Sequence, residues 1–186
     1  MAKALDFRRR REALTDYRKR LSMVRGGIDR IVIRKTNRRI IAEIVRYGEK
    51  GDSVLAYVDS SLLTSKYKWP SRSNRPTAYL TGLELARLAA EKIGDLKSRE
   101  YVLDIGLSSP VKNSIPFVFA RGCADGGLRV RENIEIKKEV YDYSNTEYAA
   151  KAAAGGVHYS SFAKEGVGLE RLGSAFEETR KKIMNK

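Results

Sequence analysis

The sequence predicts an α/β protein with a mixed sheet, in which a parallel crossover strand joins an antiparallel meander. Three runs rich in Ile and Val follow one another with only short turns between them, over residues 30–35, 40–47 and 53–58. A long segment with an apolar stripe separates the third run from a fourth, over 101–105. A helix of that length between two strands returns the chain to a parallel position in the same sheet.

A short helix is expected before the first strand, from about residue 15 to 24. Asp16 stands where an N-cap carboxylate is favoured, and Gly26 stands where helices commonly end. Apolar side chains recur between them at helical spacing, so that one face is apolar and the rest is basic. These apolar residues are Tyr17, Leu21 and Val24.

Short turns join the first three strands. The first turn, over 36–39, is Thr-Asn-Arg-Arg, and the second, over 48–52, holds two glycines. Both lengths are typical of β-hairpins. We therefore expect the strands to pair antiparallel in chain order, with a cationic first turn.

A loop and two helices are expected around the fourth strand. The loop, over 65–75, places Lys, Tyr, Trp and Arg among Ser, Asn and Pro. Pro76 opens the first helix, because a missing N–H costs nothing in a first turn, and Gly94 ends it. The second helix covers 115–125.

The pattern weakens beyond residue 130. We expect a short Ala-rich helix over 145–154 and a final helix over 169–184. The apolar face of the final helix holds Leu172, Phe176 and Ile183. The chain thus divides into a basic N-terminal arm, an α/β core and an extended and helical C-terminal extension, over residues 1–14, 15–130 and 131–186.

Positive charge is concentrated at the N-terminus. The chain has 37 Lys and Arg against 23 Asp and Glu, a net charge of +14, and residues 1–40 alone hold 14 Lys and Arg against 4 acids. Clustered cations displace counterions from a phosphate backbone, so a nucleic acid is favoured over the alternative of a merely solvated surface. The apolar residues of the arm are too sparse for a membrane-surface helix. Because like charges repel, we expect the arm to become ordered only on binding.

The composition excludes several chemistries. One Cys and one His rule out disulfide frameworks, Cys-rich zinc modules and motifs that need two His. Phosphate-binding glycine motifs are absent, so no nucleotide cofactor is expected. No apolar run approaches the length of a membrane span, and no secretory signal is recognisable. A lone Cys without a signal indicates a reducing, intracellular compartment.

Three carboxylates leave an enzymatic alternative open. Asp59, Asp104 and Asp125 each stand near the end of an expected element and could together hold Mg²⁺ for phosphodiester cleavage. Acids at such ends are also common capping residues, and no spacing makes the metal site specific. His158 has no partner that would make it a base, and Cys123 is expected to be a small buried residue.

The expected nucleic-acid contacts fall in two clusters. Cations at the tip of the first hairpin project from a rigid sheet, and the loop after residue 65 places aromatic rings between cations, which suits stacking on splayed bases. Trp69 has two interpretations, a stacking platform or a plug of the core. Helix-turn-helix spacing, zinc fingers and basic zippers are absent, so RNA is favoured over DNA.

Five short sequence blocks stand in order over residues 15–128. They are TDYRKRL at 15–21, RKTN at 34–37, NRPTAYLTG at 74–82, LDIGL at 103–107 and RGCADGGL at 121–128. Together these blocks resemble the large-subunit ribosomal protein family that binds 5S rRNA, number eighteen of the large-subunit series, and they are specific as a set although each alone is weak. The long loop with Trp69 and the extension after residue 130 resemble the archaeal and eukaryotic branch. A Pro-His usual after the last block is replaced here by Arg129-Val130-Arg131.

The resemblance implies a three-layer α/β sandwich and a non-catalytic role. The protein is expected in the cytoplasm, as a structural constituent of the large ribosomal subunit that binds 5S rRNA and helps attach it in the central protuberance. Its other expected partners are large-subunit rRNA and neighbouring ribosomal proteins, with no membrane, small-molecule substrate, metal or cofactor. The alternatives are a metal-dependent ribonuclease of similar layered fold and a free RNA-binding or chaperone module.

The resemblance also assigns roles to residues. Arg34, Lys35 and Asn37 are expected on 5S rRNA, and Asp104 is expected to hold local structure. The full set of expected RNA contacts combines these residues with those of the arm, the first helix and the two clusters. They are Arg8, Arg9, Arg10, Arg11, Arg18, Lys19, Arg34, Lys35, Asn37, Arg38, Lys66, Lys68, Trp69 and Arg72.

Overall fold

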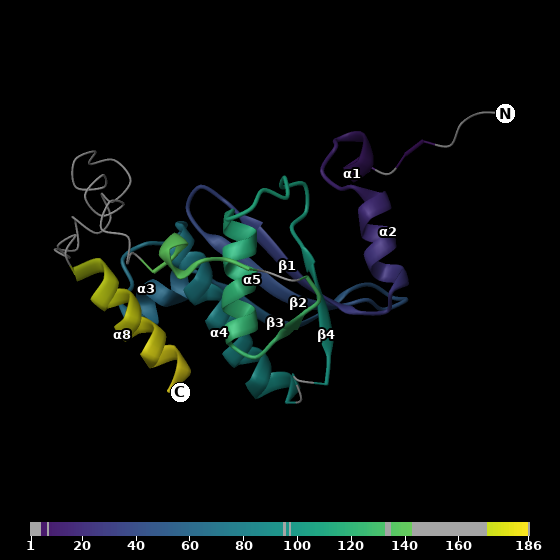
Figure 1. Ribbon diagram of the computed structural model, residues 1–186. Helices are drawn as coiled ribbons and strands as arrows, with labels where there is room; N and C mark the ends of the chain where they lie inside the picture. Colours follow the sequence, from purple (N-terminus) through teal and green to yellow (C-terminus); the bar gives the residue numbers. More distant parts are fainter. Residues whose placement is uncertain are drawn as a thin grey trace.

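A computed structural model describes residues 5–6, 8–94, 96, 98–132, 135–142 and 171–185 of the chain (Figure 1). The helix expected over 145–154 and His158 lie outside these residues, and the three-part division of the chain stays a prediction. The helices and strands are α1 (Arg8–Arg11), α2 (Tyr17–Arg25), β1 (Asp29–Lys35), β2 (Ile40–Arg46), β3 (Ser53–Asp59), α3 (Ser61–Tyr67), α4 (Arg75–Ile93), β4 (Glu100–Asp104), α5 (Ile115–Asp125), β5 (Arg129–Val130), a 3-10 turn at Lys138–Val140 and α8 (Leu172–Met184).

The strands form one mixed sheet in the order β3-β2-β1-β4-β5. β1 pairs antiparallel with β2, and β2 with β3, whereas β1 and β4 are parallel, as are β4 and β5. α4 connects the meander to β4, which makes it the expected crossover helix. The predicted α/β fold with a mixed sheet is therefore confirmed.

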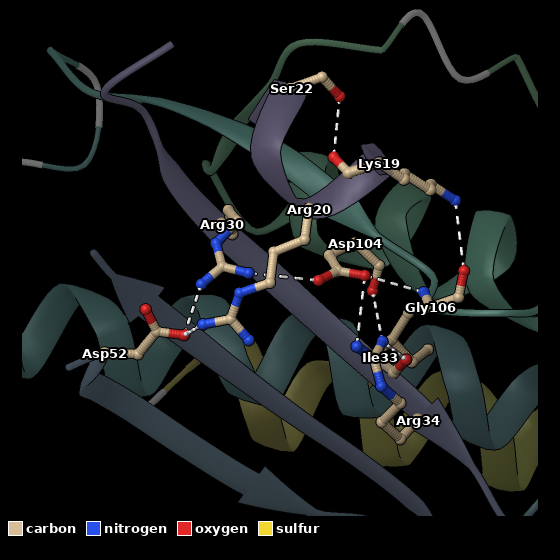
Figure 2. A network of polar contacts seen from close by, with 9 residues as sticks. All are labelled: Lys19, Arg20, Ser22, Arg30, Ile33, Arg34, Asp52, Asp104 and Gly106. Carbon is tan, nitrogen blue, oxygen red and sulfur yellow. Dashed lines mark hydrogen bonds and ion pairs between the residues drawn. The ribbon is translucent and has the colours of Figure 1, made fainter. Parts of the chain in front are cut away.

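The two faces of the sheet differ because side chains alternate along each strand. Ile31 of β1 lies between Ile44 of β2 and Leu103 of β4, and all three are buried in the core beneath α4 and α5. Burial of each such side chain contributes about 1.5–3 kcal/mol. The opposite face, which we call the open face, carries Arg30 and Arg34, and α2 lies on that side (Figure 2).

The crossover helix begins and ends where the sequence indicates. The Asn74 side chain accepts a hydrogen bond from the backbone N–H of Thr77 at 2.9 Å, and Pro76 occupies the first turn. Gly94 ends the helix with a φ of +79°, a conformation that glycine adopts without strain. The interior of α4 is enclosed because strands, α3, α5 and α8 all pack against it.

The final helix adds a further layer over α4. Its three expected apolar residues, Leu172, Phe176 and Ile183, are all buried. The Phe176 ring lies edge-on to Trp69 at 6.2 Å between centroids and tilted against Tyr79 at 5.6 Å. Residues distant in sequence therefore share one aromatic cluster between α4 and α8.

The segment expected as a loop over 65–75 differs from the prediction. α3 continues to Tyr67, and Lys68 ends it in the left-handed conformation with a φ of 60°. The stacking role expected for Trp69 is wrong, because its side chain is 1% exposed and its Nε1 donates to Thr77 Oγ1 at 2.8 Å. Trp69 is the core plug of the second interpretation, with no face open to a base.

Candidate nucleic-acid interface

α2 is fixed to the open face by polar contacts. Its N-cap is Asp16, whose carboxylate accepts from the backbone N–H groups of Arg18 and Lys19 at 3.0 and 3.1 Å. None of its residues is buried. Lys19 donates through Nζ to the carbonyl of Gly106 at 3.4 Å, and Arg20 pairs with Asp52 at 2.7 Å (Figure 2). One face of this helix therefore remains available to a partner.

A network of Arg and Asp side chains lies beneath α2 (Figure 2). Arg30 is only 3% exposed, and its guanidinium reaches Asp52 at 2.8 Å and Asp104 at 3.4 Å. Asp104 also accepts from Arg34 at 3.3 Å and from the backbone N–H of Gly106 at 2.8 Å. A buried cation needs such partners, because unpaired burial costs several kcal/mol. Asp104 thus holds local structure, as the resemblance implies.

A groove of about 410 Å³ runs between the arm, α2 and the ends of β1 and β4. Its acids, Asp16 and Asp104, are already bonded to backbone N–H groups or arginines. The groove is therefore electropositive, a property that attracts phosphates. Its cationic lining residues are Arg9, Lys19, Arg20, Arg34 and Lys35.

The tip of the β1–β2 hairpin is a tight cationic turn. Thr36 Oγ1 accepts from the backbone N–H groups of Arg38 and Arg39 at 3.3 and 3.0 Å and donates to the Arg39 carbonyl. Arg39 pairs with Asp59 at 2.9 Å. Lys35 and Arg38 are exposed, and their side chains form no ion pair with any described residue. These two cations, with Asn37 between them, are the freest groups at the tip.

Arg34 is more constrained than the sequence indicates. Its Nη1 donates to the carbonyls of Ile33 and Asp104, both at 2.8 Å, while its side chain remains half exposed. The guanidinium is therefore held at the mouth of the groove in a fixed orientation. The contact of Arg34 with RNA stays a prediction. Nη1 is not available for it, because Nη1 already donates to the two carbonyls.

The basic arm contains one turn of helix, α1. Arg9 donates through Nε to Thr15 Oγ1 at 3.0 Å, and Arg8 and Arg10 form exposed ion pairs with Glu12 and Asp6 at 3.8 and 3.4 Å. Exposed pairs of this kind contribute at most about 1 kcal/mol. Only weak contacts therefore hold this turn, and ordering of the arm on binding stays a prediction.

The second expected cluster lies apart from the groove. α3, which carries Lys66, and α2 are at opposite ends of the molecule in Figure 1. The Nζ of Lys66 is bound to the buried carboxylate of Glu84 at 3.1 Å. Arg72 and Lys68 are exposed, and Ser73 donates to the Asn37 carbonyl at 3.3 Å, which brings the loop containing Arg72 next to the hairpin tip.

The three carboxylates of the enzymatic alternative have separate partners. Asp59 pairs with Arg39, Asp104 with Arg30 and Arg34, and Asp125 accepts from the Tyr79 hydroxyl at 2.8 Å. Within the described ranges no group of three His, Cys, Asp or Glu side chains is placed to hold a metal ion. Over the same residues, every helix is too short or too polar to cross a membrane.

Comparisons with known proteins agree with the motifs. Residues 3–100 match the model of a family described as ribosomal large subunit proteins 60S L5 and 50S L18. The chain is also 45% identical over 131 residues to the large ribosomal subunit protein uL18 of Haloarcula marismortui. That alignment covers 70% of this chain and 67% of the relative.

Proposed function

The chain belongs to the family of large-subunit ribosomal proteins 60S L5 and 50S L18, and from this premise we propose that it binds 5S rRNA and helps attach it in the central protuberance. Family membership makes the protein a structural constituent of the large ribosomal subunit in the cytoplasm, a part of a ribonucleoprotein and not an enzyme. The partner within the subunit and the residues that contact it are our proposal.

The electropositive groove carries this proposal. Four separate parts of the chain line it, namely the arm, α2, the end of β1 and the loop after β4. Contacts from several elements at once suit recognition of a folded RNA by its shape and backbone, which is how RNA helices are bound. The groove therefore supports docking on a defined RNA surface better than the loose binding expected of a free chaperone.

Binding proceeds in two physical stages. The arm, with Arg8 to Arg11 in the helical turn α1, attracts phosphates over long range and releases their counterions. The body then docks, with Lys19 and Arg34 at the groove and the exposed Arg18 beside Lys19 on α2. Lys35, Asn37 and Arg38 make the contacts of the hairpin tip. The exposed Lys68 and Arg72, with Lys66, form a second contact in this proposal, which begins at the loop beside the hairpin tip.

The test compares two double variants of the full chain for affinity to 5S rRNA. We expect Lys35→Ala with Arg38→Ala to weaken binding about tenfold, because two phosphate contacts are removed from a site that otherwise keeps its shape. Lys181→Ala with Lys182→Ala removes the same charge from the last turn of α8, and we expect less than a twofold effect. Equal losses from both pairs would mean that the site lies elsewhere.

A second measurement separates the ribosomal role from a free RNA-binding module. The full chain should sediment with large ribosomal subunits and protect 5S rRNA, uncut, from chemical probing. Similar affinity for 5S rRNA and for unrelated RNA duplexes, without cosedimentation, would favour the chaperone alternative.

A further inference from the structure

β3 is a terminal strand of the sheet. In the order β3-β2-β1-β4-β5, only β2 pairs with it. Among the described residues, no backbone or side-chain group hydrogen-bonds to its outer side. Seven residues, Ser53–Asp59, thus present one unpaired edge, which is long enough to bind another strand.

The register shows which backbone groups point outward. The Ser60 N–H donates to the Ile40 carbonyl at 2.9 Å, so this pair is hydrogen-bonded across the two strands. Hydrogen-bonded and non-bonded pairs alternate in an antiparallel ladder. Val58, opposite Ala42, is therefore bonded to β2, and the N–H and C=O of Tyr57 point to the free edge.

The sequence of β3 lacks the usual protection of an exposed edge. It reads Ser-Val-Leu-Ala-Tyr-Val-Asp, without the Lys or Pro residues that discourage strand addition. Two large side chains are exposed along it, Val54 at 54% and Tyr57 at 47%. The other edge strand, β5, has only two residues, Arg129 and Val130, and therefore has far fewer backbone groups with which another strand could pair.

A carboxylate without a partner lies beside Tyr57. Glu43 is opposite Tyr57 in the register of β2 and β3, on the open face, and it is half-buried. Its neighbours on the same face, Asp59 and Asp104, are both paired with arginines. Glu43 has no such pair among the described side chains. An unpaired carboxylate at this position favours a cation as its neighbour.

We propose that the outer edge of β3 binds an extended segment of a neighbouring large-subunit protein, which adds to the sheet as a sixth strand. An Arg or Lys of that segment lies opposite Tyr57, where it stacks on the ring and faces Glu43, with apolar residues on either side. Peptide backbone supplies alternating donors and acceptors at the spacing that the edge requires, whereas RNA brings negatively charged phosphates next to an unneutralised carboxylate. The inference rests on membership of the large subunit and not on the contacts proposed for 5S rRNA.

Site-specific cross-linking tests the nature of the occupant. A photoreactive benzoylphenylalanine replaces Tyr57 in protein that has been incorporated into large subunits, and the purified subunits are irradiated. We expect an adduct that resists ribonuclease and maps, by mass spectrometry, to one extended segment of another subunit protein. The same group in place of Arg38 is the control, and its adduct should be with RNA. An RNA adduct, a second copy of this chain, or no adduct at position 57 would each overturn the proposal.

A pair of variants at the same position tests the backbone contact. Tyr57→Val removes the ring but keeps the outward N–H, whereas Tyr57→Pro removes both, and proline is tolerated at the outer side of an edge strand. In competition for incorporation into large subunits, we expect the Pro variant to be roughly fivefold weaker than the Val variant, the effect of one lost hydrogen bond. Equal incorporation would refute strand addition.

Affinity for 5S rRNA is measured on the same two variants. We expect it to be unchanged in both, because neither Val nor Pro at position 57 alters the groove. A loss of 5S rRNA affinity without a loss of stability would place the RNA on this face and overturn the inference while leaving the proposed function intact.

Discussion

Gly82 of α4 and Gly122 of α5 face each other where the two helices cross. A Cβ atom on Gly82 would meet the Phe119 carbonyl and the Cys123 backbone nitrogen, the latter at 2.9 Å, and one on Gly122 would meet the backbone of Tyr79. The helices therefore touch backbone to backbone. This close approach is the reason that glycine stands at both positions within helices that it otherwise weakens.

Gly82→Ala should destabilise the protein by about 2–3 kcal/mol, because the new methyl group meets backbone atoms that cannot move independently. The measurement is the free energy of unfolding in denaturant. Gly26→Ala is the control, since Gly26 has a φ of −70° and a Cβ there would lie at ordinary contact distance, 3.5 Å from the Met23 carbonyl. Equal effects of the two changes would contradict the proposed contact.

Glu84→Ala should cost about 3–5 kcal/mol, the usual result of breaking a buried ion pair. Its carboxylate is fully buried and binds Lys66 at 3.1 Å, the Tyr67 hydroxyl at 2.9 Å and Arg87 at 2.9 Å. Removal deprives all three groups of this one buried acceptor. Glu91→Ala, which deletes an exposed partner of Arg87, is the control and should change the unfolding free energy by less than about 1 kcal/mol.

The same carboxylate should make stability depend on pH. Burial opposes its charged form, but hydrogen bonds from Arg87, Lys66 and Tyr67 outweigh burial and lower the pKa of Glu84 below its ordinary value of 4.5. A lowered folded-state pKa stabilises the fold fully above pH 4.5, and this stability is lost as the pH falls through the lower value. Glu84→Gln should flatten the decline in unfolding free energy below pH 4.5; an unchanged decline would exclude this residue as its cause.

Phe176→Ala should destabilise the protein by about 3–5 kcal/mol, because it removes a fully buried ring that contacts Trp69, Tyr79 and Tyr141. Hydrogen exchange of the α8 amides should accelerate in the variant. Met184→Ala, at an exposed position of the same helix, should have little effect. An unchanged free energy of unfolding in the Phe176→Ala variant would mean that α8 does not stabilise the core.

Deletion of residues 1–12 should reduce the dependence of 5S rRNA affinity on salt. Each phosphate contact that is lost removes about 0.9 from the slope of log affinity against log salt concentration, and Arg8 to Arg11 offer up to four such contacts. The measurement is a titration at several salt concentrations with the full and the shortened chain. An unchanged slope would exclude the arm from binding.

The sequence predicts the sheet and its main helices well because their determinants are local. Runs rich in Ile and Val specify β1 and β2, and Asn74, Pro76 and Gly94 specify the ends of α4. The sequence does not indicate α3, since its N-cap residue Ser60 makes no side-chain capping bond and its C-cap Lys68 is not a glycine. Tertiary packing, rather than local propensity, decides that segment.

The sequence predicts the positive charge of the candidate site but not which of its cations are available for binding. The density of cations indicates a polyanion, but it does not show which cations are neutralised by distant residues. Arg30 and Arg34 stand four residues apart on one strand and look alike in the sequence, yet one is buried and both are bound to Asp104, about seventy residues further along the chain. The burial of Trp69 likewise depends on residues outside its own segment, namely Thr77, which accepts its N–H, and Phe176, which packs against its ring.

The parallel pairing of β1 with β4 determines when the binding surface is complete during synthesis. Lys19 is anchored to the Gly106 carbonyl, 87 residues later in the chain. The most basic part of the polypeptide thus leaves the translating ribosome well before the far wall of its groove exists. Non-local strand pairs also form slowly, since their loop must close first. The cations of the N-terminal segment are therefore synthesised before β4 can form the far wall of the groove that they line.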